Sequence, residues 1–136
     1  MTYVDPTQEQ LEAFAASAGD EGSLFMLNLL RFKNRADGSL EGDDVSGAEA
    51  YTRYAAATQP HLERVGGEIL WAGGCGRALI GPADGEWDVA AIVRYPSRSA
   101  FLEMVSDPDY LEISRIRTAA LADSRLLPCT EAVLGA

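Results

Sequence analysis

Two segments of this 136-residue chain are apolar on both sides when they are placed on an extended backbone. Residues 24–32 (LFMLNLLRF) and 87–95 (WDVAAIVRY) have the length and composition of strands. An antiparallel strand with one face in water alternates apolar and polar residues, and these two segments do not. Both faces of the predicted sheet therefore need a cover. We expect helices on one face and a second copy of the same chain on the other.

The balance of charge restricts the partners of the chain. The formal net charge is -10, from 11 basic and 21 acidic residues, so the surface repels phosphate backbones and anionic lipids. We expect neither a nucleic-acid nor a membrane partner. No segment is apolar enough to suggest a transmembrane helix, and the N-terminus lacks the basic and then apolar pattern of a secretion signal. These features predict a cytoplasmic protein with a single domain.

Few residues are suited to holding a metal or a cofactor. The chain has two cysteines, Cys75 and Cys129, and one histidine, His61, and no familiar zinc spacing relates them. Residues 73–76 (GGCG) lack the Lys-Ser/Thr ending of a phosphate-binding loop. We therefore predict no metal and no cofactor.

Hydrophobic periodicity and capping residues predict a helix followed by the order β-α-β-β-α-β. Asp5, Pro6 and Gln8 have the spacing of a cap, a first helical residue and a capping box. Ser46, Ser97 and Asp107 are expected to cap the later helices. The expected strands cover residues 23–33, 68–81, 86–95 and 124–133.

Three local signals add detail to this pattern. Pro60 lies inside the helix that follows Ser46, so a kink or break is expected near residues 58–59. The glycines of residues 73–76 predict a bulge or sharp bend within their strand. Pro128 cannot donate to a ladder, which favours an edge position or a bulge for the last strand.

The order of elements defines an α+β fold of the ferredoxin-like, split βαββαβ type. In this fold helices cover one face of an antiparallel sheet and the other face is open. Residues 1–22 are expected to form an N-terminal helical extension, and residues 23–136 the domain itself.

Several segments resemble a known family. The chain is similar to the domain of unknown function 1330 family, within the dimeric α/β-barrel superfamily, and the similarity covers nearly everything after residue 23. The most specific segment is WDVAAIVRYPSRSAFLEMVSDPDYLE at residues 87–112. The other segments are MLNLLRFK (26–33), YTRYAAAT (51–58), RVGGEILWAG (64–73) and RTAALADSRLL (117–127).

The resemblance implies a homodimer in which two sheets face one another in a barrel. It implies no agreed activity. The superfamily includes cofactor-independent monooxygenases, small-molecule isomerases and haem-degrading enzymes, which is an analogy of fold only. In the haem-degrading relatives the key histidine lies on the helix after the third strand. Residues 96–121 of this chain contain none, so haem ligation is not expected.

Polar residues in or beside the predicted strands are the first candidates for a site. Asn28 interrupts an apolar strand, and a buried amide without a partner costs on the order of 1–3 kcal/mol. It either contacts a ligand or an oxyanion, or bonds to a neighbour within the protein or across the dimer. Arg31 and Arg94 could hold a carboxylate substrate in fork geometry. The alternative is that they form salt bridges, for which an acidic chain offers many partners.

The helices supply the second set of candidates. His61 follows Tyr54 by seven residues, so both lie on one face of an unbroken helix, and an imidazole suits acid–base catalysis. The alternative is a partly exposed histidine without a function. Tyr54, Tyr110 and Trp87 could line a pocket for a flat ligand, or they could pack in the core and at its rim.

Two hypotheses about function follow. In the first, a homodimer binds a small carboxylated or aromatic molecule, and any catalysis is cofactor-independent acid–base or oxygenation chemistry. His61 would then be the base, Asn28 or Arg94 would stabilise negative charge, and the substrate-binding residues would be Arg31, Tyr54, Trp87 and Tyr110. In the second, the protein is a noncatalytic dimeric binding or assembly module, whose Asn28 and Arg94 side chains form only internal or interface pairs.

Overall fold

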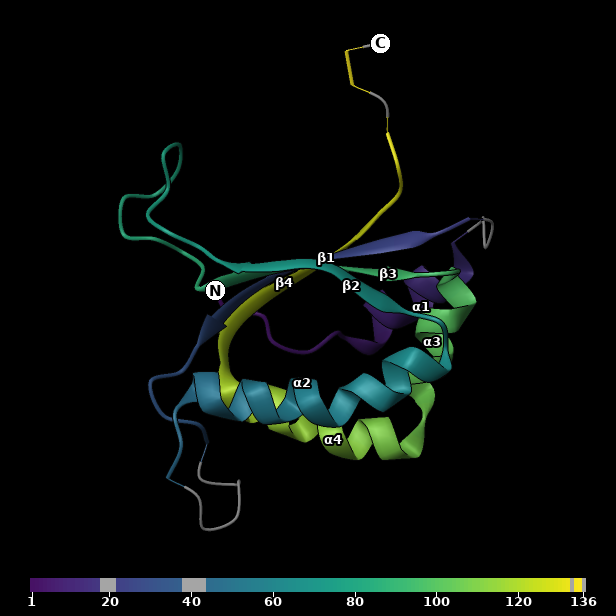
Figure 1. Cartoon of the computed structure of the whole chain (residues 1–136), viewed down its shortest axis with the longest axis horizontal. Coiled ribbons are helices and arrows are strands. Elements are labelled where there is room, and N and C mark those ends of the chain that lie inside the picture. Colours follow the sequence, from purple (N-terminus) through teal and green to yellow (C-terminus); the bar gives the residue numbers. More distant parts are fainter. Residues whose placement is uncertain (18–21, 38–43, 133, 136) are drawn as a thin grey trace.

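A four-stranded antiparallel sheet carries its helices on one face, and its other face has no layer above it (Figure 1). The computed structural model describes residues 1–17, 22–37, 44–132 and 134–135. Along the chain the elements are α1 (Gln8–Ala16), β1 (Leu24–Phe32), α2 (Gly47–Arg64), β2 (Glu68–Gly74), β3 (Val89–Tyr95), α3 (Arg98–Ser106), α4 (Pro108–Ala120) and β4 (Leu121–Cys129). The order β2-β3-β1-β4 is that of the ferredoxin-like fold and confirms the predicted fold class.

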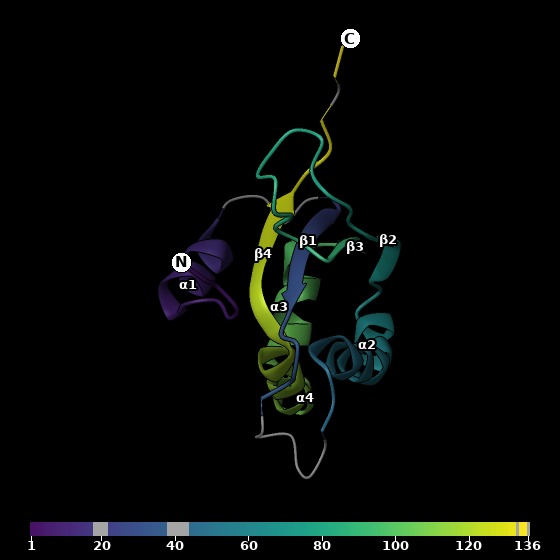
Figure 2. The same cartoon turned by 90° about the vertical axis from the view of Figure 1, so that its left-hand side faces the viewer.

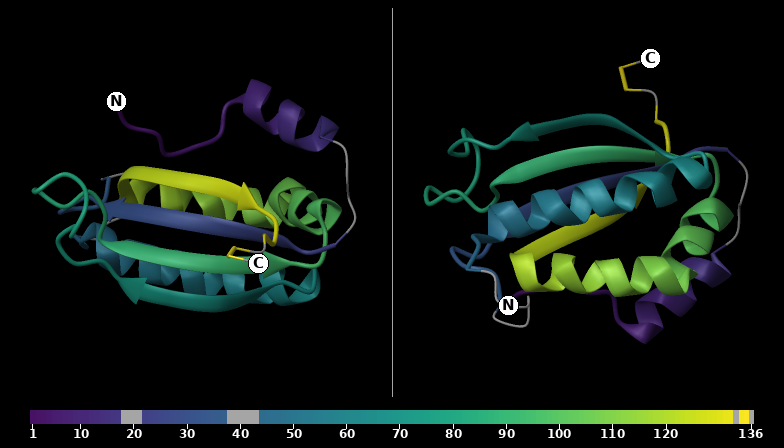
Figure 3. Two further views of the ribbon diagram at one scale, coloured as in Figure 1. Left: turned by 90° about the horizontal axis from the view of Figure 1, so that it is seen from above. Right: turned by 60° about the horizontal axis from the view of Figure 1, so that its bottom comes forward.

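The register of the strands assigns each residue of β1 to a face. Leu24, Met26 and Leu30 are at most 3% exposed and point towards the helices. Phe25, Leu27 and Leu29 belong to the open face, where Phe25 lies opposite Arg94 in β3 and Cys129 in β4. The left panel of Figure 3 looks down on this open face. The alternation is therefore present in space, although both sets of residues are apolar.

The core lies between the sheet and the helices, with α2 and α4 below the strands (Figures 1 and 3). Its buried side chains come from the strands and from three helices, and many of them are aromatic. They are Leu24, Met26, Tyr54, Leu62, Tyr95, Ala100, Phe101, Met104 and Tyr110. The helix-facing residues of the sheet are therefore covered within one chain.

The N-terminal segment lies along the β4 edge of the sheet (Figure 2). The main-chain N–H of Ser124 donates to the Tyr3 carbonyl oxygen at 2.7 Å. The Arg117 guanidinium donates to the Val4 carbonyl oxygen at 2.6 Å. Helix α1 follows and packs on α3, with the rings of Phe14 and Phe101 5.5 Å apart. Residues 18–21, beside the expected domain boundary at residue 22, lie outside the described residues.

The start of α1 differs from the prediction by two residues. Thr7, not Asp5, is the cap, and Gln10, not Gln8, closes the capping box from the third helical position. The Asp5 carboxylate instead accepts a hydrogen bond from the Thr118 hydroxyl at 2.8 Å. The later caps Ser46, Ser97 and Asp107 are confirmed. Asp107 ends α3 and also begins α4.

Helix α2 continues through Pro60 to Arg64 without the expected break. Proline removes the hydrogen bond to the carbonyl four residues earlier, here that of Ala56. Ala56 is exposed, so water can replace the missing donor. The opposite face of the helix is held in the core by Tyr54, His61 and Leu62. Packing therefore maintains the helix through the proline.

The second and last strands also differ from their expected bounds. β2 ends at Gly74, and its irregularity lies between Ile69 and Trp71 rather than at the glycines. The Trp71 ring lies against Gly73, where any side chain would collide with it. Residues 75–88 leave the sheet, and β4 starts directly after α4, at Leu121. β4 is an edge strand, as Pro128 predicts.

Gly47 lies where the end of β1, the start of α2 and the end of α4 meet. A Cβ at this position would collide with the carbonyl oxygens of Lys33 and Ala120, which are backbone atoms with little freedom to move. We expect Gly47→Ala to lower the free energy of unfolding by about 1–3 kcal/mol, the usual cost of overpacking. Urea denaturation followed by circular dichroism measures the change. Gly76→Ala is the control, because nothing lies within 4 Å of its added methyl group.

Candidate functional site

The seven predicted site residues fall in three separate places. Tyr54, His61 and Tyr110 lie together in the layer between the sheet and the helices, and Asn28 is on the same side of β1. Arg31 and Trp87 line a cleft at one end of the sheet. Arg94 is on the open face, opposite Phe25.

Tyr54 and Tyr110 form a buried hydroxyl pair between α2 and α4. Their oxygens are 2.7 Å apart and each residue is 8% exposed. In such a pair one hydroxyl donates, and the proton of the other remains available for a further acceptor. The rings meet edge to face with centroids 6.3 Å apart, so packing fixes the direction of both hydroxyls.

His61 and Thr58 lie on the same face of α2 as Tyr54, because they follow it by seven and four residues. Both are at least nine-tenths buried. The Nδ1 atom of His61 and the hydroxyl oxygen of Thr58 have no hydrogen-bond partner among the described residues. Buried polar atoms without a partner are rare in folded proteins, and they are often satisfied by ordered water or a ligand.

Asp107 is the nearest carboxylate to the imidazole. Its Oδ2 atom is 4.0 Å from His61 Nδ1, beyond hydrogen-bond length, and accepts a bond from Arg64 at 2.8 Å. The hydrogen bond from the main-chain N–H of Asp109, followed by the bond from Arg64, holds the pKa of the Asp107 carboxyl below its ordinary value. Asp107 therefore stays ionised beside His61.

The tyrosines around Thr58 and His61 are neutral at physiological pH. Burial raises the pKa of Tyr51 from 10.0 to about 12, and it also raises the pKa values of Tyr54, Tyr95 and Tyr110. The positive charge of Arg117 opposes the shift at Tyr51, Tyr54 and Tyr110. These phenols can therefore act as hydrogen-bond donors, with a cation near them.

Asn28 already uses part of its hydrogen-bonding capacity within its own strand. Its side-chain amide donates to the carbonyl oxygen of Met26 at 3.2 Å. It lies between Met26 and Leu30 on the face that points to the helices, opposite Ala91 in β3.

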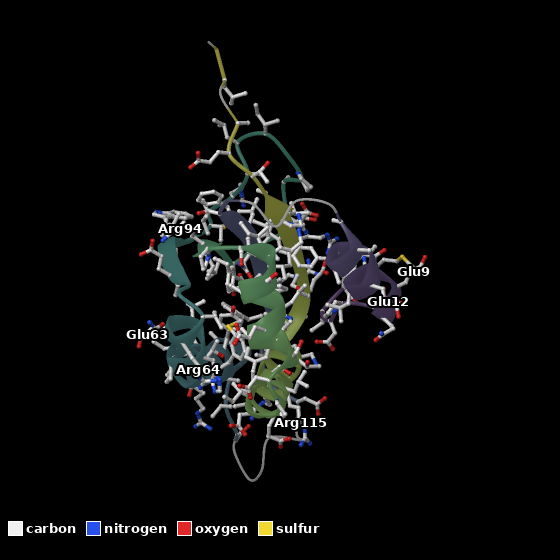
Figure 4. The ribbon with its side chains drawn as sticks, turned by 90° about the vertical axis from the view of Figure 1, so that its right-hand side faces the viewer. Glu9, Glu12, Glu63, Arg64, Arg94 and Arg115 are labelled. Carbon is white, nitrogen blue, oxygen red and sulfur yellow. The ribbon has the colours of Figure 1, made fainter. Side chains whose placement is uncertain are left out.

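Arg94 does not share the interior with these residues. The first hypothesis groups Arg94 with His61 and Asn28 at one catalytic site, and the structure separates Arg94 from both of them. Arg94 and Asn28 project from opposite faces of the sheet, because Arg94 is paired with Phe25. Its guanidinium binds Glu68 at 2.8 Å and donates to the Ser23 hydroxyl at 3.2 Å. Figure 4 shows Arg94 beside the sheet and Arg64 in the helical layer.

Arg31 and Trp87 belong to an ionic cluster at the end of the sheet. Asp123, only 5% exposed, binds Arg125 at 2.7 Å and Arg31 at 3.5 Å. The Arg125 guanidinium lies 5.2 Å from the centroid of the Trp87 ring, within the range of a cation–π contact. A cleft of about 240 Å³ adjoins Arg31 and Trp87, and three carboxylates also line it, those of Asp84, Glu86 and Asp88.

The open face carries an apolar groove of about 310 Å³. Phe25, Leu27, Leu70, Ile92 and Cys129 supply most of its lining. Exposed apolar side chains continue beyond it: Trp71 is 55% exposed and Leu127 is 46% exposed. A contiguous apolar surface on a folded chain usually marks an interaction site.

The described residues show no sign of a metal site. No group of three or more His, Cys, Asp or Glu side chains is close enough to hold an ion within residues 1–17, 22–37, 44–132 and 134–135. Cys75 and Cys129 are both free. None of the helices in the described part of the chain has the length and apolarity needed to span a membrane.

Sequence reasoning missed three residues that shape these sites. Thr58 lies midway between Tyr54 and His61, and helical spacing alone indicated its face. Asp107 was recognised as a cap but not as a neighbour of His61, since that contact links two helices. Asp123 gave no signal, because its partners lie at residues 3, 31 and 125.

Structural comparison places the chain among ferredoxin-like proteins. Residues 41–128 match the family described as Domain of unknown function (DUF1330). The chain belongs to this family, which confirms the resemblance seen in the sequence. The RPA0582 protein of unknown function from Rhodopseudomonas palustris is 41% identical, with a TM-score of 0.89 over 98% of this chain and 99% of that chain.

More distant solved structures share the fold alone. SnoaB, a cofactor-independent oxygenase from Streptomyces nogalater, is 15% identical, with a TM-score of 0.50 over 85% of this chain and 99% of that chain. A dimeric protein of unknown function from Bacteroides fragilis is 9% identical, with a TM-score of 0.51 over 82% of this chain and 98% of that chain. A comparison with curated proteins finds no match.

The hydroxyl pair can be tested by a double-mutant cycle on Tyr54→Phe and Tyr110→Phe. Each single change leaves one buried hydroxyl without its partner, so we expect a loss of about 1–3 kcal/mol in the free energy of unfolding. The double variant should lose less free energy of unfolding than the sum of the two single losses, because neither hydroxyl remains unpaired. Urea titrations give all four values, and strictly additive losses would contradict the pairing.

Proposed function

We propose that this protein is a homodimer that binds a small molecule between the sheet and the helices of each protomer. The bound compound would be aromatic or carboxylated. The observation that carries the ligand site is the pair of buried, unpartnered polar atoms on α2, the Nδ1 atom of His61 and the hydroxyl oxygen of Thr58. A ligand with a polar group would satisfy them at the same place as the free proton of the Tyr54–Tyr110 pair.

The side chains around His61 and Thr58 support an aromatic or carboxylated ligand. Tyr51 and Tyr54 are 5.2 Å apart between ring centroids, and the imidazole and the Tyr110 ring are 6.5 Å apart, so the neighbours of His61 are aromatic. Flat apolar ligands pack well against aromatic rings. Arg117, whose charge acts on Tyr54 and Tyr110, supports a carboxylate on the ligand.

If the site is catalytic, cofactor-independent acid–base chemistry follows from its composition. The unpartnered Nδ1 atom of His61 would accept a proton from an acidic C–H or O–H group of the substrate. The ionised Asp107 stabilises the imidazolium that forms. The oxygen that gains negative charge on the substrate would accept hydrogen bonds from the Tyr54–Tyr110 pair and from Asn28. In an oxygenation, the resulting carbanion would react with molecular oxygen.

A noncatalytic dimeric module is the second candidate, and one observation favours it. Arg94 binds Glu68 and Ser23, while the Asn28 amide donates within its own strand. Two of the three residues considered for catalysis therefore form internal pairs. In this alternative the open face serves assembly, and ordered water satisfies His61 and Thr58.

Dimerisation through the open face predicts that Leu127→Asp separates the protomers. A buried carboxylate without a partner is strongly unfavourable, so the dimer dissociation constant should rise by at least about tenfold. Leu111→Asp is the matched control, since Leu111 is 52% exposed on α4, in the helical layer away from the open face. Light scattering across a dilution series measures both. A monomeric wild-type protein would contradict the proposal.

His61 is the only histidine of the chain, so its imidazole resonance identifies itself in an NMR spectrum of protein without a histidine tag. Titration with a panel of small aromatic carboxylates should shift this resonance. His61→Gln should weaken binding by about tenfold or more, as expected for the loss of a hydrogen bond to a charged group. Tyr3→Phe, at the exposed N-terminus, is the control. Binding that leaves the imidazole resonance unchanged would place the ligand elsewhere.

A further inference from the structure

The connection between β2 and β3 forms an arm that ends in two fully exposed aliphatic residues. This β2–β3 arm comprises residues 75–88. Leu79 is 99% exposed and Ile80 is 95% exposed, the highest values of any large hydrophobic residues in the described interior of the chain. Figures 1 and 2 show that the arm projects beyond the end of the sheet and away from the helices, on the side of the open face. Two aliphatic side chains in water are unfavourable, and the described residues of one protomer do not bury them.

The apolar groove lies at the other end of the same face. The arm leaves the sheet where Val89 of β3 lies opposite Leu30 of β1. The groove surrounds Phe25, near the start of β1, and Cys129, which lies opposite Phe25 at the end of β4. Arm and groove are therefore separated by most of the length of β1 and cannot meet within one chain.

Arm and groove can meet between two copies related by a two-fold axis. When the open faces of two copies stack about an axis that lies between the sheets and at right angles to the strands, each end of one sheet lies over the opposite end of the other. The arm of each copy then reaches the groove of its partner, and the two contacts are identical by symmetry.

We propose that the β2–β3 arm clasps the second copy of this chain, with Leu79 and Ile80 seated in the partner's apolar groove. The inference rests on the proposed homodimer and adds its register, which the apolar character of the faces alone leaves open. The groove volume, about 310 Å³, suits a small number of aliphatic side chains, and its lining is almost entirely apolar.

One ion pair is available to the same pairing, although the arm also carries Asp84, Glu86 and Asp88, which line one cleft with Arg77. Arg77 lies in the arm two residues before Leu79, and Glu131 lines the groove beside Cys129. Within the described residues, neither of these two side chains forms an ion pair. In the clasp, Arg77 of one copy approaches the partner's Glu131, which fixes the direction of the contact.

The groove contains a natural cysteine, so a cross-link can test the clasp. In a Cys75→Ser background, Leu79→Cys should form a disulfide with the partner's Cys129 under mild oxidation. Denaturing gels without reductant would then show a covalent dimer, and added Cys129→Ser should abolish it. Glu103→Cys, on α3, is the matched control and should not cross-link. Leu79 is fully exposed, so the substitution does not threaten folding.

Each other outcome of this experiment counts against the clasp. A band that survives Cys129→Ser, or a dimeric variant that forms no disulfide, would show that the arm docks elsewhere. A ladder of higher species would show an open, head-to-tail contact between dimers instead of a closed pair. A monomeric wild-type protein would overturn the homodimer itself, which separates failure of the proposed function from failure of the clasp.

A charge exchange gives a second, independent measure. Arg77→Glu should raise the dimer dissociation constant by about threefold to tenfold, as a partly exposed ion pair allows. Adding Glu131→Arg should restore it, because the pair is re-formed with its signs reversed. Light scattering provides the constants. Additive weakening in the double variant would contradict the proposed direction of the contact.

Discussion

The apolar character of both faces of the sheet is the constraint on which the rest of the structure depends. Each square ångström of apolar surface removed from water contributes about 25 cal/mol, so neither face is stable when fully exposed. On one side the chain meets this requirement with α2, α3 and α4, whose aromatic side chains bury Leu24 and Met26. On the other side the chain covers only the edges of the sheet. The arginines of that face, Arg31, Arg94 and Arg125, are each paired with a carboxylate.

This division separates two kinds of chemistry. The helix-facing layer holds neutral donors and a single imidazole, with Asp107 and Arg117 at its edge. The open face and its ends hold the ion pairs of Arg31, Arg94 and Arg125. In an acidic protein, cations on an accessible face are neutralised by neighbouring carboxylates, which leaves little net attraction for a free anionic ligand there. A ligand that enters the interior meets fewer competitors for the polar groups, and this is the physical reason to place the site under the helices.

The sequence predicted the order of elements and the fold because both depend on local signals. Ser46, Ser97 and Asp107 cap their helices as expected, since a cap is satisfied by residues two or three positions away. The break expected at Pro60 does not occur, because the burial of one face of α2 outweighs a missing hydrogen bond. This burial depends on residues distant in the chain. Thr7 replaced Asp5 as a cap for a similar reason, since Asp5 bonds to Thr118.

The grouping of site residues was harder to predict than the fold. His61 and Tyr54 share a face of α2, as their helical spacing indicates, and α4 adds Tyr110 beside them. The side of the sheet that carries Arg94 could not be predicted, because the alternation of a strand assigns residues to two faces but does not say which face meets the helices. When the residues on both faces are apolar, their hydropathy does not show which face meets the helices. Only the register, with Arg94 opposite Phe25, decides it.

The N-terminal segment along β4 has a consequence for how the sheet can grow. The exposed backbone of an edge strand is a template for strand addition by another chain. Tyr3 occupies that template where β4 begins, through its bond with Ser124, and Pro128 withholds a donor near the end of the strand. Strand addition by another chain at this edge is thus hindered at two points, at Tyr3 and at Pro128.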